Sequence, residues 1–161
     1  MNTTPGHSRA TNELYAVLSP ELRTELANCE QSVTVPAGTK LIKRGVLPDK
    51  LVIVNSGQVE ITLDCLRESI SLDCAAAGKV FGMRAVVSGE LPEADVTCQN
   101  KCRVALIPRD TFLKTVRQHP EMYFAIAKVL SHDLVMAQRL LKTSLHRPFR
   151  KTITKSLSWP N

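Results

Sequence analysis

The chain has 161 residues, and 43% of them are hydrophobic, which is enough for one domain with one core. It has no run of eighteen apolar residues and no apolar N-terminal stretch, which argues against a transmembrane or a secreted protein. The formal net charge is +6, but the last seventeen residues hold four basic residues and no acidic one, so the body is nearly balanced. We expect a cytoplasmic protein with no membrane partner and a solvated basic tail.

The N-terminal part is expected to be a polar lead-in followed by a helix. Residues 1–11 are polar, which predicts a disordered segment. Residues 12–29 are predicted to be helical. Within this stretch Ser19 is a candidate N-cap, Pro20 suits the first helical position, and Glu21 lies near the positive end of the helix dipole.

Short β-strands are predicted from about residue 32 onward. Residues 51–54 form a continuous apolar run, typical of a strand buried on both faces, whereas residues 58–63 alternate, which is typical of a strand with one wet face. Residues 96–107 supply the last strands. Several short strands of this kind predict a sandwich or a jelly-roll barrel. The turns between the runs carry Gly38, Gly45, Gly57, Gly78 and Gly82.

The periodicity changes after Pro108 and predicts two helices. The first is short and has Asp110 as a candidate N-cap. His119-Pro120-Glu121 then interrupts the chain, and residues 121–144 contain neither Gly nor Pro. A helix of that length would be roughly 36 Å long at about 1.5 Å per residue.

The long helix carries a seam of residues at alternating gaps of four and three. Two interpretations of the seam remain open: the helix lies across its own barrel, or it pairs with a second subunit as in a coiled coil. The second interpretation is preferred, although the polar Asp133 lies on the seam. The residues proposed for a dimer helix are Ile126, Leu130, Asp133, Ala137 and Leu140.

The cysteines and histidines predict neither a metal site nor a cofactor. The five cysteines are odd in number and include no C-x-x-C pair, so we expect free, mostly buried thiols, with a redox switch or an iron–sulfur site as the alternative. Cys98 and Cys102 are four apart in a predicted strand and are expected on one face. The four histidines match no metal-binding pattern, and no catalytic triad or phosphate loop is present, so no enzyme is expected.

Three stretches in order resemble the cyclic-nucleotide-binding domain of the catabolite-activator and oxygen-sensor (Crp/Fnr) regulators. They are Pro36-Ala37-Gly38, residues 51–61 and residues 78–82. The resemblance covers roughly residues 14–144 and implies an α+β fold, in which a jelly-roll barrel is flanked by an N-terminal helix and a long C-terminal helix. The implied organisation is a lead-in over 1–11, the barrel with its helix over 12–118, the long helix over 119–144 and a basic tail over 145–161.

The resemblance also implies a ligand cassette over residues 81–96, which aligns with the family pattern without a gap. In the family, a short helix after a glycine receives the cyclic phosphate, a Glu after that glycine holds the ribose, and an Arg followed by Ser or Thr binds the phosphate. The scaffold positions are kept at Phe81, Gly82, Ala85, Val86, Val87, Ala94 and Val96.

The chemical positions of the cassette differ from the family pattern. Met83 replaces the Glu, Pro92 the Arg, and Glu93 the Ser or Thr. Methionine is a poor acceptor for a hydroxyl, proline has no charge, and Glu93 would repel a phosphate. The resemblance therefore implies a retained scaffold with the usual ligand chemistry lost. Arg84 has two open roles: it pairs with Glu90 or Glu93, or it restores an anion site.

Two functions follow from this interpretation. The first is a non-enzymatic regulatory module, a homodimer through the long helix, that senses a non-standard small molecule or a protein. The alternative is a true cyclic-nucleotide receptor domain of a Crp/Fnr-type transcription regulator.

Family members usually carry a helix-turn-helix domain after the long helix, for which residues 145–161 are too few, so the chain is a stand-alone module or a fragment. Direct DNA binding is not expected without another domain; a weak, salt-sensitive contact through the tail is a third hypothesis.

Overall fold

The computed structural model describes residues 12–65 and 68–145. The chain forms two compact units, of which unit 1 ends at Leu130 and unit 2 begins at Ser131. The lead-in predicted over 1–11 and the basic tail from residue 146 lie outside the described residues. Each unit is described by itself below.

The N-terminal segment contains two helical pieces, so the prediction of one continuous helix over 12–29 is wrong. A 3-10 turn, η1 (Tyr15–Val17), precedes helix α1 (Pro20–Cys29). Ser19, with ψ of 158°, is extended, because a residue before proline is disfavoured in the α region. Its hydroxyl accepts a hydrogen bond from the N–H of Leu22 at 3.4 Å, which confirms the predicted N-cap.

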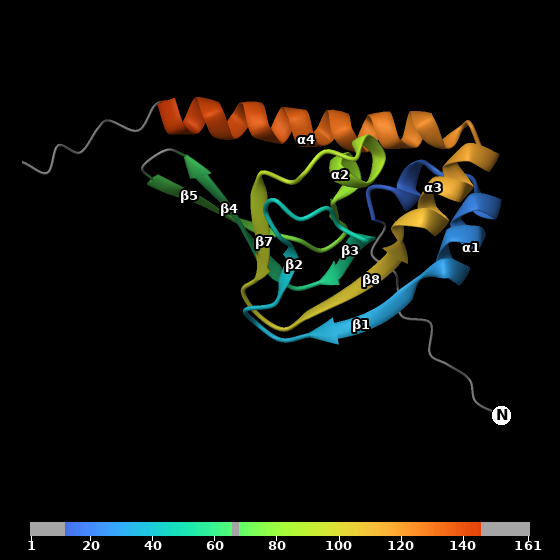
Figure 1. The fold of residues 1–161 in the computed structure, drawn as a ribbon, viewed down its shortest axis with the longest axis horizontal. Coiled ribbons are helices and arrows are strands. Elements are labelled where there is room, and N and C mark those ends of the chain that lie inside the picture. Colours follow the sequence, from blue (N-terminus) through green and yellow to red (C-terminus); the bar gives the residue numbers. More distant parts are fainter. Residues whose placement is uncertain (1–11, 66–67, 146–161) are drawn as a thin grey trace, which may run out of the picture. The chain divides into compact units, whose positions relative to one another are not determined.

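Two four-stranded antiparallel sheets form a sandwich, as predicted (Figure 1). One sheet has the order β1-β8-β3-β6 and the other β2-β7-β4-β5. The chain crosses repeatedly between the sheets, which is the pattern of a jelly roll. The strands are β1 (Gln31–Val35), β2 (Lys40–Ile42), β3 (Lys50–Ser56), β4 (Gln58–Cys65), β5 (Glu68–Ala75), β6 (Val80–Phe81), β7 (Ala94–Cys98) and β8 (Cys102–Pro108).

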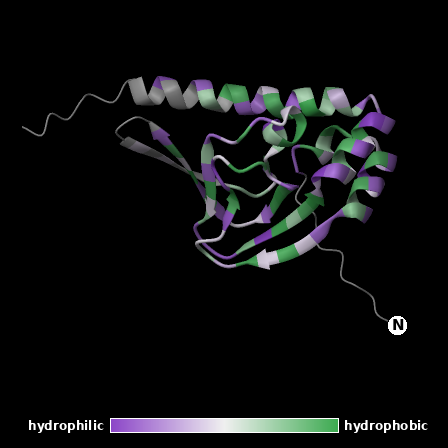
Figure 2. Ribbon diagram, in the orientation of Figure 1, coloured by the Kyte–Doolittle hydropathy of each residue, from purple (hydrophilic) through white to green (hydrophobic). Residues whose placement is uncertain are grey.

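Strand β3 is buried on both faces, as its apolar run predicted. Leu51 and Ile53 belong to one core cluster, together with side chains of the helices, and Val52 and Val54 belong to a second. The alternation follows from the two-residue period of a strand. We call the first cluster the helix-side core; it includes Leu22, Leu26, Ala105, Ile107, Phe112, Val116 and Met122. We call the second the inter-sheet core; it includes Ile42, Val59, Val96, Cys98, Cys102 and Val104. Figure 2 shows the hydrophobic residues of the strands and helices in green.

Three further helices complete the described chain. Helix α2 (Met83–Ser88) connects β6 to the segment before β7. Helix α3 (Arg109–Gln118) follows β8 directly and has Pro108 as its N-cap, so Asp110 lies in the first turn and is not the N-cap that was expected. The Asp110 carboxylate therefore does not cap the helix, but it interacts favourably with the positive end of the helix dipole.

Helix α4 (Met122–Leu145) agrees closely with the long helix predicted over 121–144. Its first nine residues belong to unit 1, where Met122, Ala125, Ile126 and Val129 are buried in the helix-side core. Its remaining described residues, 131–145, belong to unit 2.

Cys98 and Cys102 lie in two different strands, so the prediction that they share one strand is wrong. Cys98 ends β7 and Cys102 begins β8, and the turn between them carries the chain from one sheet to the other. Both thiols are buried in the inter-sheet core and both are free. Burial, helped by the neighbouring Cys102 thiol, raises the pKa of Cys98 to about 12. A thiol with this pKa is a poor nucleophile and a poor metal ligand at neutral pH.

The described residues offer neither a membrane span nor a metal cluster. None of the described helices is long and apolar enough to cross a membrane. Over the same residues, no group of three or more His, Cys, Asp and Glu side chains could hold a metal ion.

Candidate functional site

The candidate site is built on helix α2 and on the segment that returns from it to β7. Gly82 precedes α2 in the left-handed region, with φ of 88°. A Cβ at this position would lie 3.1 Å from Cδ1 of Ile42 and 3.7 Å from both the carbonyl oxygen of Lys50 and Cγ of Pro48. The backbone conformation therefore favours glycine here, and an added Cβ would also require the end of the Ile42 side chain to shift.

Met83, the first residue of α2, is directed into the protein interior. Its side chain is 1% exposed and belongs to the helix-side core. Val86 of the same helix also belongs to this core, and Ala85 is buried as well. The position at which the family pattern has a ribose-binding carboxylate is thus occupied by a buried apolar side chain. A carboxylate in this environment would be costly without a partner.

Arg84 is exposed on α2 and is paired within the site. Its guanidinium donates to Oε2 of Glu90 at 2.7 Å and to the carbonyl oxygen of Leu91 at 3.2 Å. Of the two open roles, the pairing with Glu90 is therefore the one observed. Glu93, the other candidate partner, is exposed and makes no hydrogen bond or ion pair among the described residues.

The return segment is held by the loop between β2 and β3. The carbonyl oxygen of Pro92 accepts a hydrogen bond from the N–H of Gly45 at 2.9 Å. Pro92 and Ala94 are half-buried, and Ala94 begins β7. Arg84 thus links α2 to Glu90 and Leu91 at the start of the return segment, and Gly45 holds Pro92 further along it, while Gly82, Met83 and Ala85 lie at the start of α2 and Glu93 and Ala94 follow Pro92.

Asp95 is a further residue of this region that the sequence analysis missed. Its carboxylate accepts from Nζ of Lys40 at 2.7 Å and from the N–H of Arg44 at 2.8 Å. The Lys40 ammonium, followed by the Arg44 N–H, holds the pKa of Asp95 below its ordinary value of 3.8. The guanidinium of Arg44 forms a further ion pair with the carboxylate of Asp64, with 2.7 Å between Nη1 and Oδ2. The partners of Asp95 lie more than fifty positions away, so no local signal could have identified the cluster.

The residues proposed for a dimer helix fall into different environments. Ile126 is 4% exposed within the helix-side core, and Leu130 packs against that core. Asp133 and Ala137 are exposed, whereas the side chain of Leu140 lies outside the described part of the structure. Of the large hydrophobic residues in α4, Tyr123, Phe124, Leu134 and Val135 are exposed.

A family model for the cyclic nucleotide-binding domain matches residues 32–119, which span β1 to the residue after α3 and include the whole site around α2. The chain belongs to this family. The family assignment and the sandwich agree with the fold implied by the resemblance.

Individual relatives are more distant and include proteins of different architecture. The chain is 27% identical over 99 residues to a cAMP-dependent protein kinase regulatory subunit of Emericella nidulans; the match covers 62% of this chain and 24% of that protein. The chain thus spans about a quarter of the length of this curated relative.

Solved structures with a similar fold include regulators and isolated domains. The catabolite activator protein of Thermus thermophilus has a TM-score of 0.68 at 22% identity, over 83% of this chain and 63% of that chain. A cyclic nucleotide-binding domain of Methylobacillus flagellatus has a TM-score of 0.70 at 16% identity, over 94% of this chain and 84% of that chain. At these identities the similarity concerns the fold alone.

Proposed function

We propose that this protein is a non-enzymatic regulatory module of the cyclic nucleotide-binding domain family that does not bind cyclic AMP in the family's usual way. It responds instead to another small molecule or to a protein partner. The proposal rests on family membership together with the chemistry of the site around α2, where the three positions that would bind ribose and phosphate are Met83, Pro92 and Glu93.

The burial of Met83 is the observation that carries the proposal. Its side chain is 1% exposed, so the position is neither polar nor open to a ribose. Glu93 adds an exposed negative charge, and two like charges about 4 Å apart repel by roughly 1 kcal/mol in water. Loss of an arginine that binds phosphate removes a further interaction of about 1.5–3 kcal/mol. Each loss of about 1.4 kcal/mol lowers the affinity tenfold, so these losses together weaken the binding of a cyclic nucleotide by orders of magnitude.

Calorimetry with cyclic AMP and cyclic GMP tests the proposal. We expect no saturable heat from the natural sequence at millimolar nucleotide. Because Met83 is buried among apolar side chains, Met83→Glu should destabilise the fold and should not supply a ribose acceptor, so the variant Met83→Glu with Pro92→Arg and Glu93→Ser should also show no saturable heat. Saturable micromolar binding by the natural sequence would contradict the proposal.

We further propose that the module self-associates through α4. Tyr123 and Phe124 are 55% and 73% exposed, and Leu134 and Val135 are 60% and 41% exposed. Because Ile126 and Leu130 already pack in the helix-side core of unit 1, the proposed contact consists of the exposed Leu134 and Val135 of unit 2.

A second candidate, a true cyclic-nucleotide receptor that uses Arg84, is favoured by one observation. The Arg84–Glu90 ion pair is exposed, with side chains 47% and 68% accessible, and exposed pairs of this kind contribute little free energy. Arg84 could therefore exchange Glu90 for a phosphate at small cost. The test is Arg84→Ala: if the natural sequence binds cyclic nucleotide and Arg84→Ala does not, this second candidate replaces the first.

A further inference from the structure

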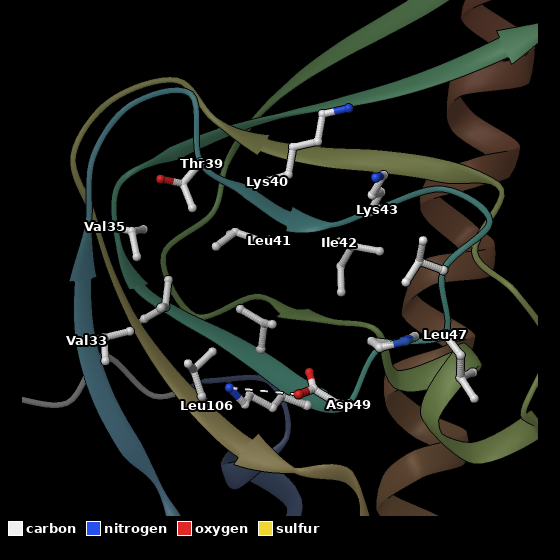
Figure 3. Close-up of a pocket in the computed structure, with 15 residues that line it drawn as sticks. Val33, Val35, Thr39, Lys40, Leu41, Ile42, Lys43, Leu47, Asp49 and Leu106 are labelled. Carbon is white, nitrogen blue, oxygen red and sulfur yellow. Dashed lines mark ion pairs between the residues drawn. The ribbon is translucent and has the colours of Figure 1, made fainter.

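A cavity of about 310 Å³ opens between the two sheets, beside β1, β2 and the loop that joins β2 to β3 (Figure 3). Its volume falls in the range of pockets that hold small organic molecules. The walls come from strands of both sheets and are aliphatic. The principal wall residues are Val33, Val35, Leu41, Val52, Val104 and Leu106.

The cavity is an incompletely filled part of the inter-sheet core. At the other end of this core Val54, Val59 and Cys102 are fully buried. At the cavity, by contrast, Val33 and Leu106 remain only half-buried although their side chains belong to the same interior. Protein interiors are normally close-packed, and an apolar space of this size favours an apolar occupant over water.

The mouth of the cavity is positively charged. Lys40, Lys43, Lys50 and Asp49 are among the lining residues, so three positive charges face one negative charge. Lys40 is neutralised by Asp95, and Lys50 lies 4.0 Å from Asp49, at the limit of an ion pair. Within the described residues Lys43 forms no ion pair. A ligand that carries a negative head group would therefore meet an unneutralised lysine beside an apolar space.

We propose that this cavity binds a soluble medium-chain aliphatic carboxylate, with the chain between β2 of one sheet and the paired strands β1 and β8 of the other, and the carboxylate at Lys43. The aliphatic walls accept the chain, and the surplus positive charge at the mouth accepts the carboxylate. The site is separate from Met83, Pro92 and Glu93 and goes beyond the proposed function.

The cavity also adjoins the site around α2. Ile42, Pro48 and Lys50 line the cavity, and the same three residues are those that a Cβ on Gly82 would meet. The loop between β2 and β3 is hydrogen-bonded to the return segment through Gly45 and Pro92. A ligand that displaces this loop would therefore disturb the backbone at the start of α2.

Decanoate is the probe for the full chain, with binding measured by calorimetry and located by amide chemical shifts. We expect saturable binding, shifts in β1, β2 and residues 43–50, and weaker binding of decanol, which has the chain without the charge. Lys43→Gln should lower the affinity for decanoate about tenfold, because the substitution removes one charge-assisted contact. Lys114→Gln, which removes an exposed lysine from α3, is the matched control and should leave the affinity unchanged.

A second variant tests the apolar part of the site. Val35→Phe fills the cavity from β1 and should abolish decanoate binding, whereas its unfolding midpoint should remain near that of the natural sequence because Val35 is only half-buried. The proposal is overturned if decanoate does not bind, if the shifts map elsewhere, or if decanol and decanoate bind equally. Binding to phosphatidylglycerol vesicles without binding to decanoate would likewise overturn it.

Discussion

Gly57, between β3 and β4, is a position at which two constraints exclude every side chain. Its φ of 118° lies in the region that glycine favours, and a Cβ there would lie 2.4 Å from Sγ and 3.0 Å from Cα of Cys102. The second contact involves backbone and cannot be relieved by rotating a side chain. This glycine thus sets the distance between the end of β3 and the start of β8.

Gly57→Ala should lower the free energy of unfolding by about 2–4 kcal/mol. Backbone strain at positive φ costs of order 1–3 kcal/mol, and overpacking costs typically about 1–3 kcal/mol. Gly38→Ala is the matched control, because Gly38 has φ of 84° and a Cβ added there would meet nothing within 4 Å. Urea unfolding followed by circular dichroism measures both. Equal losses in the two variants would show that the contact with Cys102 is unimportant.

Asp95 is the residue for which a pH dependence can be predicted. Its pKa is lowered in the folded chain, first by Lys40 and then by the Arg44 N–H, so its ionised form stabilises the fold. This contribution is present above the ordinary carboxyl pKa of about 4 and is lost as the pH falls through the lower pKa of the folded state.

Asp95→Asn should therefore be less stable than the natural sequence at pH 7, and the difference should shrink below about pH 4. Urea unfolding at a series of pH values measures it. Glu93→Gln is the control, because Glu93 is exposed and has no hydrogen bond or ion pair among the described residues. A stability difference for Asp95→Asn that is independent of pH would contradict the assigned role.

At the scale of elements, α4 contributes differently along its length. Within unit 1 it supplies Met122, Ala125, Ile126 and Val129 to the helix-side core. Within unit 2 it presents Leu134 and Val135 as exposed side chains. Helix α2, by contrast, is buried over most of its first turn. Met83, Ala85 and Val86 are buried, and Arg84 alone of its first four residues is exposed.

Ile126→Ala and Leu134→Ala should separate the two roles of α4. Ile126→Ala should lower the free energy of unfolding by about 2–5 kcal/mol, because it leaves a space in the core. Leu134→Ala should change the stability of the subunit by less than about 0.5 kcal/mol and weaken self-association. Urea unfolding at low protein concentration and sedimentation equilibrium distinguish these outcomes. A monomeric natural sequence at high concentration would contradict the proposed association.

At the scale of the whole molecule, unit 1 contains both cores. Every member of the helix-side core and of the inter-sheet core lies at or before Leu130. Both sheets and helices α1, α2 and α3 also belong to this unit. The part of the chain that matches the family model, residues 32–119, lies entirely within it.

Ending the chain after Leu130 should therefore preserve the fold. We expect a free energy of unfolding within about 1 kcal/mol of the full chain, since every core side chain among the described residues is retained. Self-association should be lost with Leu134 and Val135. Circular dichroism, urea unfolding and sedimentation measure these properties. A truncated chain that is unfolded would mean that residues beyond 130 are needed for the cores to form.

The sequence by itself predicted the features that depend on neighbouring residues. The Ser19 cap followed by Pro20, the two-sided burial of residues 51–54 and the long helix after His119 are local patterns of capping, alternation and chain length. The sequence analysis was wrong where a proline decided the local conformation: Pro20 makes Ser19 extended and so interrupts the helix predicted over 12–29, and Pro108 is the N-cap of α3 in place of Asp110. The resemblance in residues 36–82 was sufficient to identify the family, because the glycine-containing turns follow one another along this chain in the same order as in the family.

Only the tertiary structure decided which of these residues meet. It brought Lys40 and Arg44 to Asp95, set Cys98 and Cys102 in opposite sheets, chose Glu90 as the partner of Arg84, and left the cavity beside β1 unfilled. It also buried Met83 and Ile126 in the helix-side core. The physical reason is that contacts between residues tens of positions apart depend on how the sheets and helices pack against one another, which the period of a single strand or helix does not contain.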